Sequence, residues 1–265
     1  MAVKSALINV MFSAADKASR RMMRDFGEVE NLQVSRKGAA DFVSQADIAA
    51  EATIREELEK SRPDWNFMME EGGSVQNDKE APTWIIDPID GTTNFLHGIP
   101  HFAISIAVLK NDKLTAGIIY DPCRNEFFHA EQGTGAFVNG RRMRVSGRRQ
   151  MADALFATGI PFLGRGSEET DAQFQEELNR VAKSSSGVRR FGSAALDLAW
   201  VAAGRYDGFW ERGLSPWDIA AGIVLVREAG GFVSDFSARD LAFKSGNVVA
   251  ANSALHVPLL KTLRG

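Results

Sequence analysis

The chain is poor in the features that mark secreted, membrane-bound or nucleic-acid-binding proteins. A single cysteine among 265 residues, Cys123, excludes an intrachain disulfide. No apolar run approaches the roughly 20 residues that a transmembrane helix needs, and a formal net charge of -3 gives no overall attraction to nucleic acid or to an anionic membrane. The first 23 residues read as an amphipathic helix broken by charges, not as a signal peptide. The cytoplasm is therefore the expected compartment, with no membrane partner.

The composition that is present is ordinary for a globular enzyme. A hydrophobic fraction of 45% in 265 residues is enough to bury a substantial core, as one large domain or two small ones. The histidines show no zinc-binding spacing such as HExxH, so we interpret them as loop or packing residues. Cys123 follows Pro122 in an expected hairpin, and we interpret it as a small core residue and not as a nucleophile. No fixed-period repeat and no low-complexity linker is visible.

The first half of the chain combines helices with short β-type segments. Apolar residues recur at helical spacing from residue 4 to 24, and a second helix is expected from 45 to 60. Six short apolar segments follow with turn residues between them, which predicts a meandering, largely antiparallel sheet. These segments are NFMME, TWIID, FAISIAVLK, LTAGIIYD, NEFFHAE and GAFVNG.

After about residue 146 strands and helices alternate, which favours parallel or mixed pairing with helical crossovers. The expected strands are ALFATG, VRRFG, YDGFWE, FVSDF and VVAAN, and the expected helices cover residues 171–183, 193–203, 216–229 and the chain from about 253. The fold class is therefore mixed α+β and α/β. We expect two tightly associated halves, 1–145 and 146–265, which could also form one structural unit.

The segment WIIDPIDGTTNF, residues 84–95, carries the clearest chemical signal. An apolar strand ends in Asp87 and Asp90, and the glycine and threonines that follow can offer free backbone N–H groups. Hard divalent cations need oxygen ligands and a phosphate needs hydrogen-bond donors, so this loop offers both. Two carboxylates held this close repel each other and take up protons unless a cation binds. The alternative is a turn whose aspartates cap the next helix; a haloacid-dehalogenase nucleophile does not fit, because that chemistry uses aspartates one residue apart.

Two further acidic positions end or begin predicted elements. Glu70 follows the strand NFMM, at the carboxyl edge where sheets commonly place ligands, and Asp218 lies at the start of a helix. Taken alone, Glu70 could be a solvated strand-end acid. Asp218 fits a capping box with Ser215, and Asp47 repeats that pattern with Ser44. Three separated carboxylate-bearing segments nevertheless suggest a multi-metal phosphate site.

Together with WDIAAGIVLVREAGG, the segment WIIDPIDGTTNF resembles the two signatures of the inositol monophosphatase family. These are Mg²⁺-dependent, lithium-sensitive phosphatases of the fructose-1,6-bisphosphatase-like superfamily. The similarity extends over nearly the whole chain and includes KGAADFVSQAD, the central hairpins and FGSAALDLAWVAAGRYDGFWE. It implies a layered αβαβα sandwich with an N-terminal antiparallel sheet and a C-terminal mixed sheet, a homodimer, and inhibition by Li⁺. One departure is Met69, where many relatives have glycine, and it bears on packing more than on metal binding.

The resemblance also implies two to three Mg²⁺ ions per active site and their ligands. Glu70, Asp87 and the backbone carbonyl of Ile89 match the ligands of the first metal. Asp90 and Asp218, with Asp87 bridging, match those of the second. Glu70 also resembles a ligand of the third, loosely held metal. Hydrolysis would then use a metal-activated water, with no protein nucleophile.

The remaining roles are carried over in the same way. Thr92, held near Asp47 and Glu70, resembles the hydroxyl that orients the attacking water. The residues that match substrate contacts are Gly91 and Thr92 through their backbone N–H groups, and Asp90, Asp218, Ser193, Ala194 and Glu211 on the metal and alcohol sides. Lys37 matches the lysine of a mobile loop.

We therefore expect a phosphoric monoester hydrolase acting on a small polyol phosphate, with myo-inositol 1-phosphate the best guess. Fructose-1,6-bisphosphatase, 3′-phosphoadenosine 5′-phosphate phosphatase and histidinol-phosphate phosphatase activities share the metal core and stay open. Glu211 favours a neutral polyol, because it would repel a second phosphate.

A hypothesis from another class is a regulatory partner of RNA or of the transcription machinery, as in some bacterial relatives. The basic run from Gly140 to Arg144 invites it, but without interleaved aromatics such a run is more often a solvated turn. Arg189 and Arg190 are equally ambiguous and could serve a dimer interface.

Overall fold

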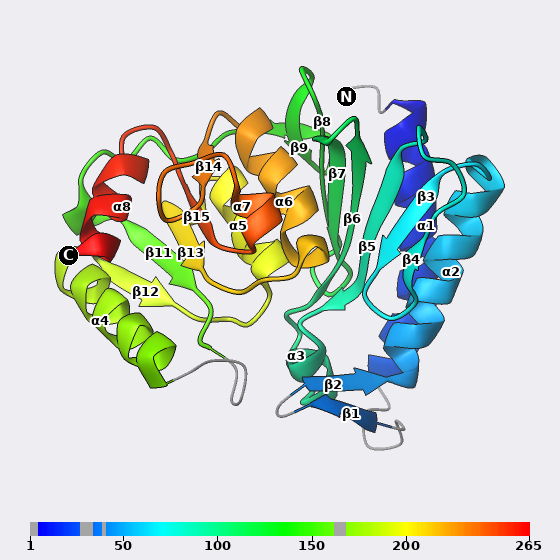
Figure 1. Ribbon diagram of the computed structural model, residues 1–265, viewed down its shortest axis with the longest axis horizontal. Coiled ribbons are helices and arrows are strands. Elements are labelled where there is room, and N and C mark those ends of the chain that lie inside the picture. The colour runs from blue at the N-terminus through cyan, green and yellow to red at the C-terminus, as the bar shows by residue number, and fades with distance from the viewer. Residues whose placement is uncertain (1–4, 27–33, 39–40, 162–167) are drawn as a thin grey trace.

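A computed structural model describes residues 5–26, 34–38, 41–161 and 168–265. Five layers follow one another across the molecule (Figure 1). Helices α1 and α2 cover the outer face of a large sheet, α5 and α6 lie between the two sheets, and α4 and α8 cover the outer face of the smaller sheet. The expected layered αβαβα sandwich is confirmed.

The large sheet has eight strands in the order β10-β9-β8-β7-β6-β5-β3-β4. Their bounds are β3 Asn66–Met69, β4 Gly73–Val75, β5 Thr83–Asp90, β6 Ala103–Lys110, β7 Lys113–Asp121, β8 Glu126–Glu131, β9 Gly135–Val138 and β10 Arg141–Met143. All neighbours are antiparallel except β3 and β5, which are parallel with Met69 opposite Ile86. The predicted, largely antiparallel sheet is confirmed, with one parallel pair that the sequence did not indicate. Because parallel strands end at the same edge, the pairing sets Glu70 beside Asp87.

The smaller sheet has five strands in the order β12-β11-β13-β15-β14. Their bounds are β11 Leu155–Thr158, β12 Gly187–Arg189, β13 Gly208–Glu211, β14 Phe232–Ser234 and β15 Val248–Ala251. The pairs β11–β12 and β11–β13 are parallel, and β13–β15 and β14–β15 are antiparallel. The predicted mixed sheet is confirmed.

Each helix that periodicity predicts is present, within a few residues of its expected bounds. The bounds are α1 Ala6–Phe26, α2 Gln45–Ser61, α4 Glu168–Ser184, α5 Ala194–Ala202, α6 Pro216–Glu228 and α8 His256–Arg264. The sequence did not predict six short pieces, since they lack a full apolar period: the hairpin of β1 Val34–Gly38 and β2 Asp41–Ser44, the edge strands β4 and β10, helix α3 Thr92–Leu96, helix α7 Ala242–Ser245 and a 3-10 turn at Met151–Asp153. The arginines of β10 lie where the sequence pattern indicated a solvated turn. The hairpin lies beside α3 (Figure 1).

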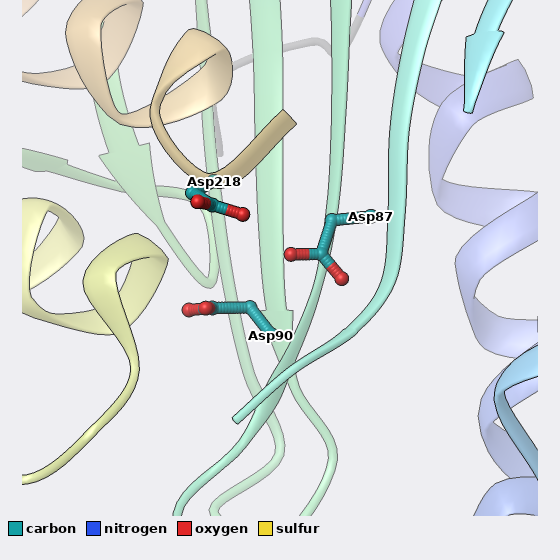
Figure 2. A group of neighbouring side chains, drawn as sticks. All are labelled: Asp87, Asp90 and Asp218. Carbon is teal, nitrogen blue, oxygen red and sulfur yellow. The ribbon is translucent and has the colours of Figure 1, made fainter. Parts of the chain in front are cut away.

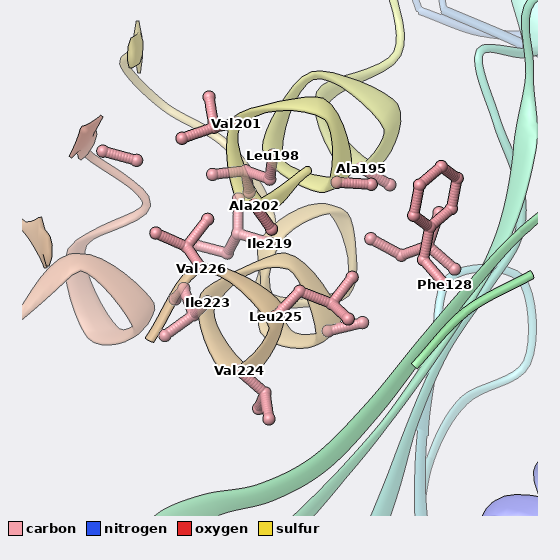
Figure 3. Close-up of a cluster of buried hydrophobic side chains, with 14 of the residues drawn as sticks. Phe128, Ala195, Leu198, Val201, Ala202, Ile219, Ile223, Val224, Leu225 and Val226 are labelled. Atoms are coloured by element: carbon pink, nitrogen blue, oxygen red, sulfur yellow. The ribbon is translucent and has the colours of Figure 1, made fainter. Parts of the chain in front are cut away.

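Helix α6 is apolar on every side because it is packed between other elements (Figure 3). A Cβ atom on Gly222 would lie 2.5 Å from Leu198 of α5, and one on Gly117 of β7 would lie 2.8 Å from the backbone of Ala221. Glycine at these two positions allows α6 to approach both α5 and the large sheet. The first turn of α6 is thereby fixed over the end of β5. Since α6 follows residue 146 and packs on the sheet of the first half, the division at 145/146 stays a prediction.

Candidate active site

Three carboxylates converge where β5 ends and α6 begins. One oxygen from each of Asp87, Asp90 and Asp218 lies within 4.8 Å of the others. Figure 2 shows the carboxyl groups of Asp87 and Asp218 directed toward each other, whereas that of Asp90 extends away from Asp87. Two of the three come from the predicted loop and the third comes from a helix that begins more than a hundred residues later.

A β-bulge explains how two aspartates three residues apart point the same way. Asp87 is opposite Ser105 and Asp90 is opposite Ala103. Between these two pairs β5 therefore contains one residue more than β6. In a regular strand, residues three apart face opposite sides of the sheet. The extra residue at Pro88–Ile89 restores a common side.

The carboxylates strongly oppose one another's ionisation. Burial, followed by the charges of Glu70, Asp90 and Asp218, holds the pKa of Asp87 well above its usual range. Hydrogen bonding with Glu70 also raises the pKa of Asp87. Burial and then Asp90 raise the pKa of Asp218 in the same direction. Burial raises the pKa of Asp90 to about 6, although hydrogen bonds from Ser193 and the α5 backbone oppose the rise.

The pocket around these groups has a volume of about 260 Å³ and an acidic lining. Among the described residues that line it, the single basic side chain is Arg190, against six carboxyl groups. The lining carboxyl groups are those of Glu70, Asp87, Asp90, Asp197, Glu211 and Asp218. Closely spaced oxygen donors without cationic partners are the ligand type that hard divalent cations prefer.

Asp218 and Asp90 both cap a helix and also belong to the acidic cluster. Asp218 accepts the Ser215 N–H at 2.7 Å, so the capping box is real and coexists with membership of the cluster. Asp90 does not cap the helix that follows it, because the N-cap residue of α3 is Gly91 and no side chain caps this helix. Its Oδ2 instead accepts the Ser193 hydroxyl at 2.5 Å and the Ala195 N–H at 2.7 Å. It therefore caps α5, in the other half of the chain.

The Thr92 side chain contacts both α2, through Asp47, and the end of β5, through Ile89. Its hydroxyl is 3.1 Å from Asp47 Oδ1 and 3.1 Å from the Ile89 carbonyl oxygen. Both partners are acceptors, so its single proton serves them and its lone pairs stay available to a water donor. Asp47 is fully buried in the first turn of α2. The side chain of Lys37, in β1, lies outside the described residues.

Glu211 lines the same pocket as the acidic cluster. It ends β13, and its carboxylate accepts the Gly159 N–H. A Cβ atom on Gly159 would lie 1.9 Å from this carboxylate, so a larger residue there would displace the carboxylate. Burial, followed by the charge of Asp90, raises the pKa of Glu211 to about 8, and Arg190 opposes the rise. Ser193 and Ala194 begin α5 in the same pocket wall.

Comparison with known proteins fits this arrangement, since the model of the inositol monophosphatase family matches residues 4–265. The chain belongs to the inositol monophosphatase family. An inositol-1-monophosphatase of Mesorhizobium japonicum is 55% identical over 98% of this chain and 97% of its own. A Nus factor SuhB of Pseudomonas aeruginosa is 44% identical over 97% and 96%. The crystal structure of the extragenic suppressor protein suhB from Bartonella henselae matches with a TM-score of 0.94 at 52% identity, covering 98% of this chain and 99% of that one.

The protein is thus a phosphatase of the inositol monophosphatase family, with a buried acidic cluster able to hold metal. Within the part of the chain that the structure covers, no helix is long and apolar enough to cross a membrane. Cys123 is half-buried against the core, and burial raises the pKa of its thiol to about 11. Arg141 and Arg142 are exposed on β10, an edge strand of the large sheet.

Several pocket residues were not expected from the sequence, among them Arg190, a candidate for a dimer interface, and Asp197, Gly159 and Asn94. Asp197 is 1% exposed, and burial, then Glu211, holds its pKa well above the usual range. Its position inside an apolar helix indicated only core packing. Gly159 was read as the end of a strand. Asn94, the residue after the threonines, belongs to a recognised signature but had no assigned role.

Proposed function

We propose that this family member is a Mg²⁺-dependent phosphatase of small polyol phosphates, with myo-inositol 1-phosphate as the first substrate to test. The observation that carries the proposal is that one pocket is lined by two sets of acidic groups: the Asp87–Asp90–Asp218 cluster, and Glu211 with the start of α5. The cluster would take the phosphate with its cations, and Glu211 would accept hydrogen bonds from the hydroxyl groups of an alcohol.

The donor set fits the metal. Buried carboxylates with raised pKa values and no described basic residue among them are the environment that a hard cation relieves. Glu70, Asp87, Asp90, Asp218 and the Ile89 carbonyl would hold two to three Mg²⁺ ions. When bound, Mg²⁺ activates water and stabilises charge on the phosphate and the leaving oxygen. Li⁺ is the expected inhibitor.

The chain's own groups would bind and orient the substrate. Thr92, fixed by Asp47, would accept a hydrogen bond from the attacking water and aim it at phosphorus. The N–H groups of Gly91 and Thr92 would donate to phosphate oxygens. Gly91 has φ 103°, and a Cβ there would lie 3.1 Å from the His101 carbonyl oxygen, so the close turn requires glycine. Lys37, which matches the family's mobile-loop lysine, is proposed for the site from the resemblance alone.

On the alcohol side, the Glu211 carboxylate would accept hydrogen bonds from ring hydroxyls. Ser193 and the Ala194 N–H would complete the contacts, with Asp90 and Asp218 near the leaving oxygen. Acidic Glu211 and Asp197 disfavour a second phosphate in this wall. This argues against fructose 1,6-bisphosphate and 3′-phosphoadenosine 5′-phosphate, and histidinol phosphate is the competitor with the least repulsion.

Phosphate release from a substrate panel tests the proposal. The panel contains inositol 1-phosphate, fructose 1,6-bisphosphate, 3′-phosphoadenosine 5′-phosphate, histidinol phosphate and p-nitrophenyl phosphate, each with Mg²⁺ and with chelator. We expect the highest kcat/KM for inositol 1-phosphate and none above background in chelator. A higher value for a bisphosphate, or full activity in chelator, would reject the proposed substrate class or the metal requirement.

A second candidate, association with the transcription machinery, is favoured by the 44% identical relative named Nus factor SuhB. The exposed arginines of β10 would be a contact surface for RNA or an acidic protein. Co-purification of RNA polymerase or ribosomal RNA leader with the wild-type protein, lost in Arg141→Glu/Arg142→Glu, would support it. Retention of a bound partner by the variant would reject that surface. A cytoplasmic homodimer is the assembly that we propose, and light scattering at micromolar concentration would test its mass.

A further inference from the structure

Asn94 connects the two halves of the pocket through its side-chain amide. It lies in α3 and is 6% exposed. Its Nδ2 donates to the His101 carbonyl oxygen at 2.8 Å and to the Phe191 carbonyl oxygen at 2.7 Å, with the Gly192 carbonyl oxygen at 3.5 Å. Phe191 and Gly192 are 97 and 98 positions later in the chain, between β12 and α5.

The carbonyl groups that meet at Asn94 cannot satisfy one another. Three backbone oxygens from two parts of the chain converge there, and the same region packs tightly against Gly91, whose Cβ would lie 3.1 Å from the His101 oxygen and 3.3 Å from the Gly192 oxygen. An amide nitrogen brings two N–H donors on a short side chain. Without it, buried carbonyl groups lose their partner and the two segments lose the bond that joins them.

Asn94 and the carbonyl groups of His101, Phe191 and Gly192 that it contacts are called the clamp below. The clamp joins the turn proposed to bind phosphate to the turn proposed to bind the alcohol. Asn94 follows Thr92 by two residues, on the phosphate side, and Gly192 precedes Ser193, on the alcohol side. Asp90 also ties β5 to α5, but Asp90 is an expected metal ligand and its oxygens would be shared with the cation. Asn94 bonds to backbone carbonyls only in its described contacts, so its tie does not depend on metal binding.

We propose that Asn94 is a positioning residue that fixes the distance between the phosphate-binding turn and the alcohol-binding turn, and thereby determines the preference for polyol phosphates. The inference rests on the proposed function. A phosphate ester without hydroxyl groups needs only the first turn, so it should not sense the clamp. A polyol phosphate needs both turns at the correct spacing.

The test compares Asn94→Leu with a matched variant, Asn66→Leu. Asn66 is 8% exposed, and its Nδ2 donates to the carbonyl oxygens of Asp78 and Ala81 at 2.7 and 3.0 Å, outside the pocket. We expect Asn94→Leu to lower kcat/KM for inositol 1-phosphate about tenfold or more, and for p-nitrophenyl phosphate less than about threefold. The Mg²⁺-induced rise in melting temperature should persist. Asn66→Leu should lower stability without changing the ratio between the two substrates. If Asn94→Leu does not fold, Asn94→Ser, which keeps one donor, should show a smaller change in the same ratio.

A double-mutant cycle with Ser193→Ala sharpens the test. If the clamp acts through the alcohol-binding turn, Asn94→Leu should add little to the loss that Ser193→Ala already causes for inositol 1-phosphate. Equal losses of kcat/KM on both substrates, or losses from Asn94→Leu and Ser193→Ala that are fully additive, would overturn the positioning role of Asn94. Neither outcome would reject the proposed function. A wild-type enzyme with no preference for inositol 1-phosphate over p-nitrophenyl phosphate would reject the proposed function and the clamp with it.

Discussion

The pocket has one end that we propose for the phosphate, called the phosphate end below, and one that we propose for the alcohol, called the alcohol end, and the two are built in different ways. The phosphate end is largely one continuous segment, in which a strand, a bulge and a short helix carry Asp87, Asp90 and Thr92 within six residues. The alcohol end is assembled from separate elements: the end of β11, the start of α5 and the end of β13. The first depends on local geometry, and the second on how the two sheets are packed. Small shifts of β11, α5 and β13 relative to β5 would therefore change the proposed substrate preference. The cluster of Asp87, Asp90 and Asp218 would stay intact.

The largest effect should come from Asp90, which belongs to both ends. Asp90→Asn keeps an acceptor for Ser193 and Ala195 but removes a metal-binding charge. We expect activity to fall by more than the roughly 10–100-fold typical of residues that only support a metal ligand. The metal-free protein should be as stable as wild type or more so, because a repelling buried charge is gone. Melts in chelator provide the measurement, and a clear loss of metal-free stability would identify Asp90 as mainly a structural cap of α5.

Asp218→Ala separates capping from metal binding at the phosphate end. A ligand at 100 times its dissociation constant stabilises by ~2.7 kcal/mol, on the order of 5–10 °C in melting temperature for a chain of this size. Mg²⁺ should raise the wild-type melt by about this amount. The variant should lose most of that gain and also melt slightly lower in chelator, because the Ser215 N–H loses its acceptor. If the Mg²⁺-induced rise in melting temperature is unchanged and the variant only melts at a lower temperature, Asp218 would be a helix cap and not a metal ligand.

Glu211→Gln probes the alcohol end by itself. We expect kcat/KM for inositol 1-phosphate to fall roughly tenfold or more, the scale of one charge-assisted hydrogen bond of ~1.5–3 kcal/mol. With p-nitrophenyl phosphate, which offers no hydroxyl groups, the change should be slight. Equal losses on the two substrates would show that both ends of the pocket depend on Glu211. A gain on fructose 1,6-bisphosphate larger than the loss on inositol 1-phosphate would point to another substrate class.

The smallest effect concerns the pH dependence of metal-free stability. The pKa of Glu211 is raised to about 8 in the folded protein, mainly by burial. A carboxyl with a raised folded pKa contributes stability that is fully present below its unfolded pKa of ~4.3 and is lost as pH rises through the folded value. Glu211→Gln should therefore flatten the decline of melting temperature between about pH 4.5 and 8. Glu169→Gln, at an exposed position of α4, is the control and should leave the slope unchanged.

The phosphate end could be read from the sequence because its signals are local. A buried strand ending in two aspartates, Pro88 between them and Gly91 after them already indicated a cation and phosphate site. The bulge was not predictable, since its effect is seen only when Asp87 and Asp90 are set against Ser105 and Ala103 of β6. The partner of Asp90 was also hidden: the local pattern pointed to the following helix, whereas the structure gives it α5, about a hundred residues away.

The alcohol end was accessible mainly through family resemblance. Ser193, Ala194 and Glu211 stand in separate elements, and no spacing rule connects them. Gly159 matters because the Glu211 carboxylate lies where its Cβ would be, which depends on the packing of β11 against β13. Asp197 looked like any polar residue in an apolar helix. Strand and helix positions followed from hydrophobic periodicity, while the parallel β3–β5 pair and the β1–β2 hairpin required tertiary contacts that periodicity does not encode.

The central claim is that one pocket holds cations with the phosphate at one end and hydroxyl groups at the other. A crystal structure with Mn²⁺ in place of Mg²⁺ and inositol 1-phosphate, with anomalous scattering to locate the metal, tests this most directly. Metal peaks between Asp87, Asp90 and Asp218, with ring hydroxyls within hydrogen-bond distance of Glu211 and Ser193, are the predicted result. Metal bound elsewhere, or a substrate whose ring points away from Glu211, would contradict the account.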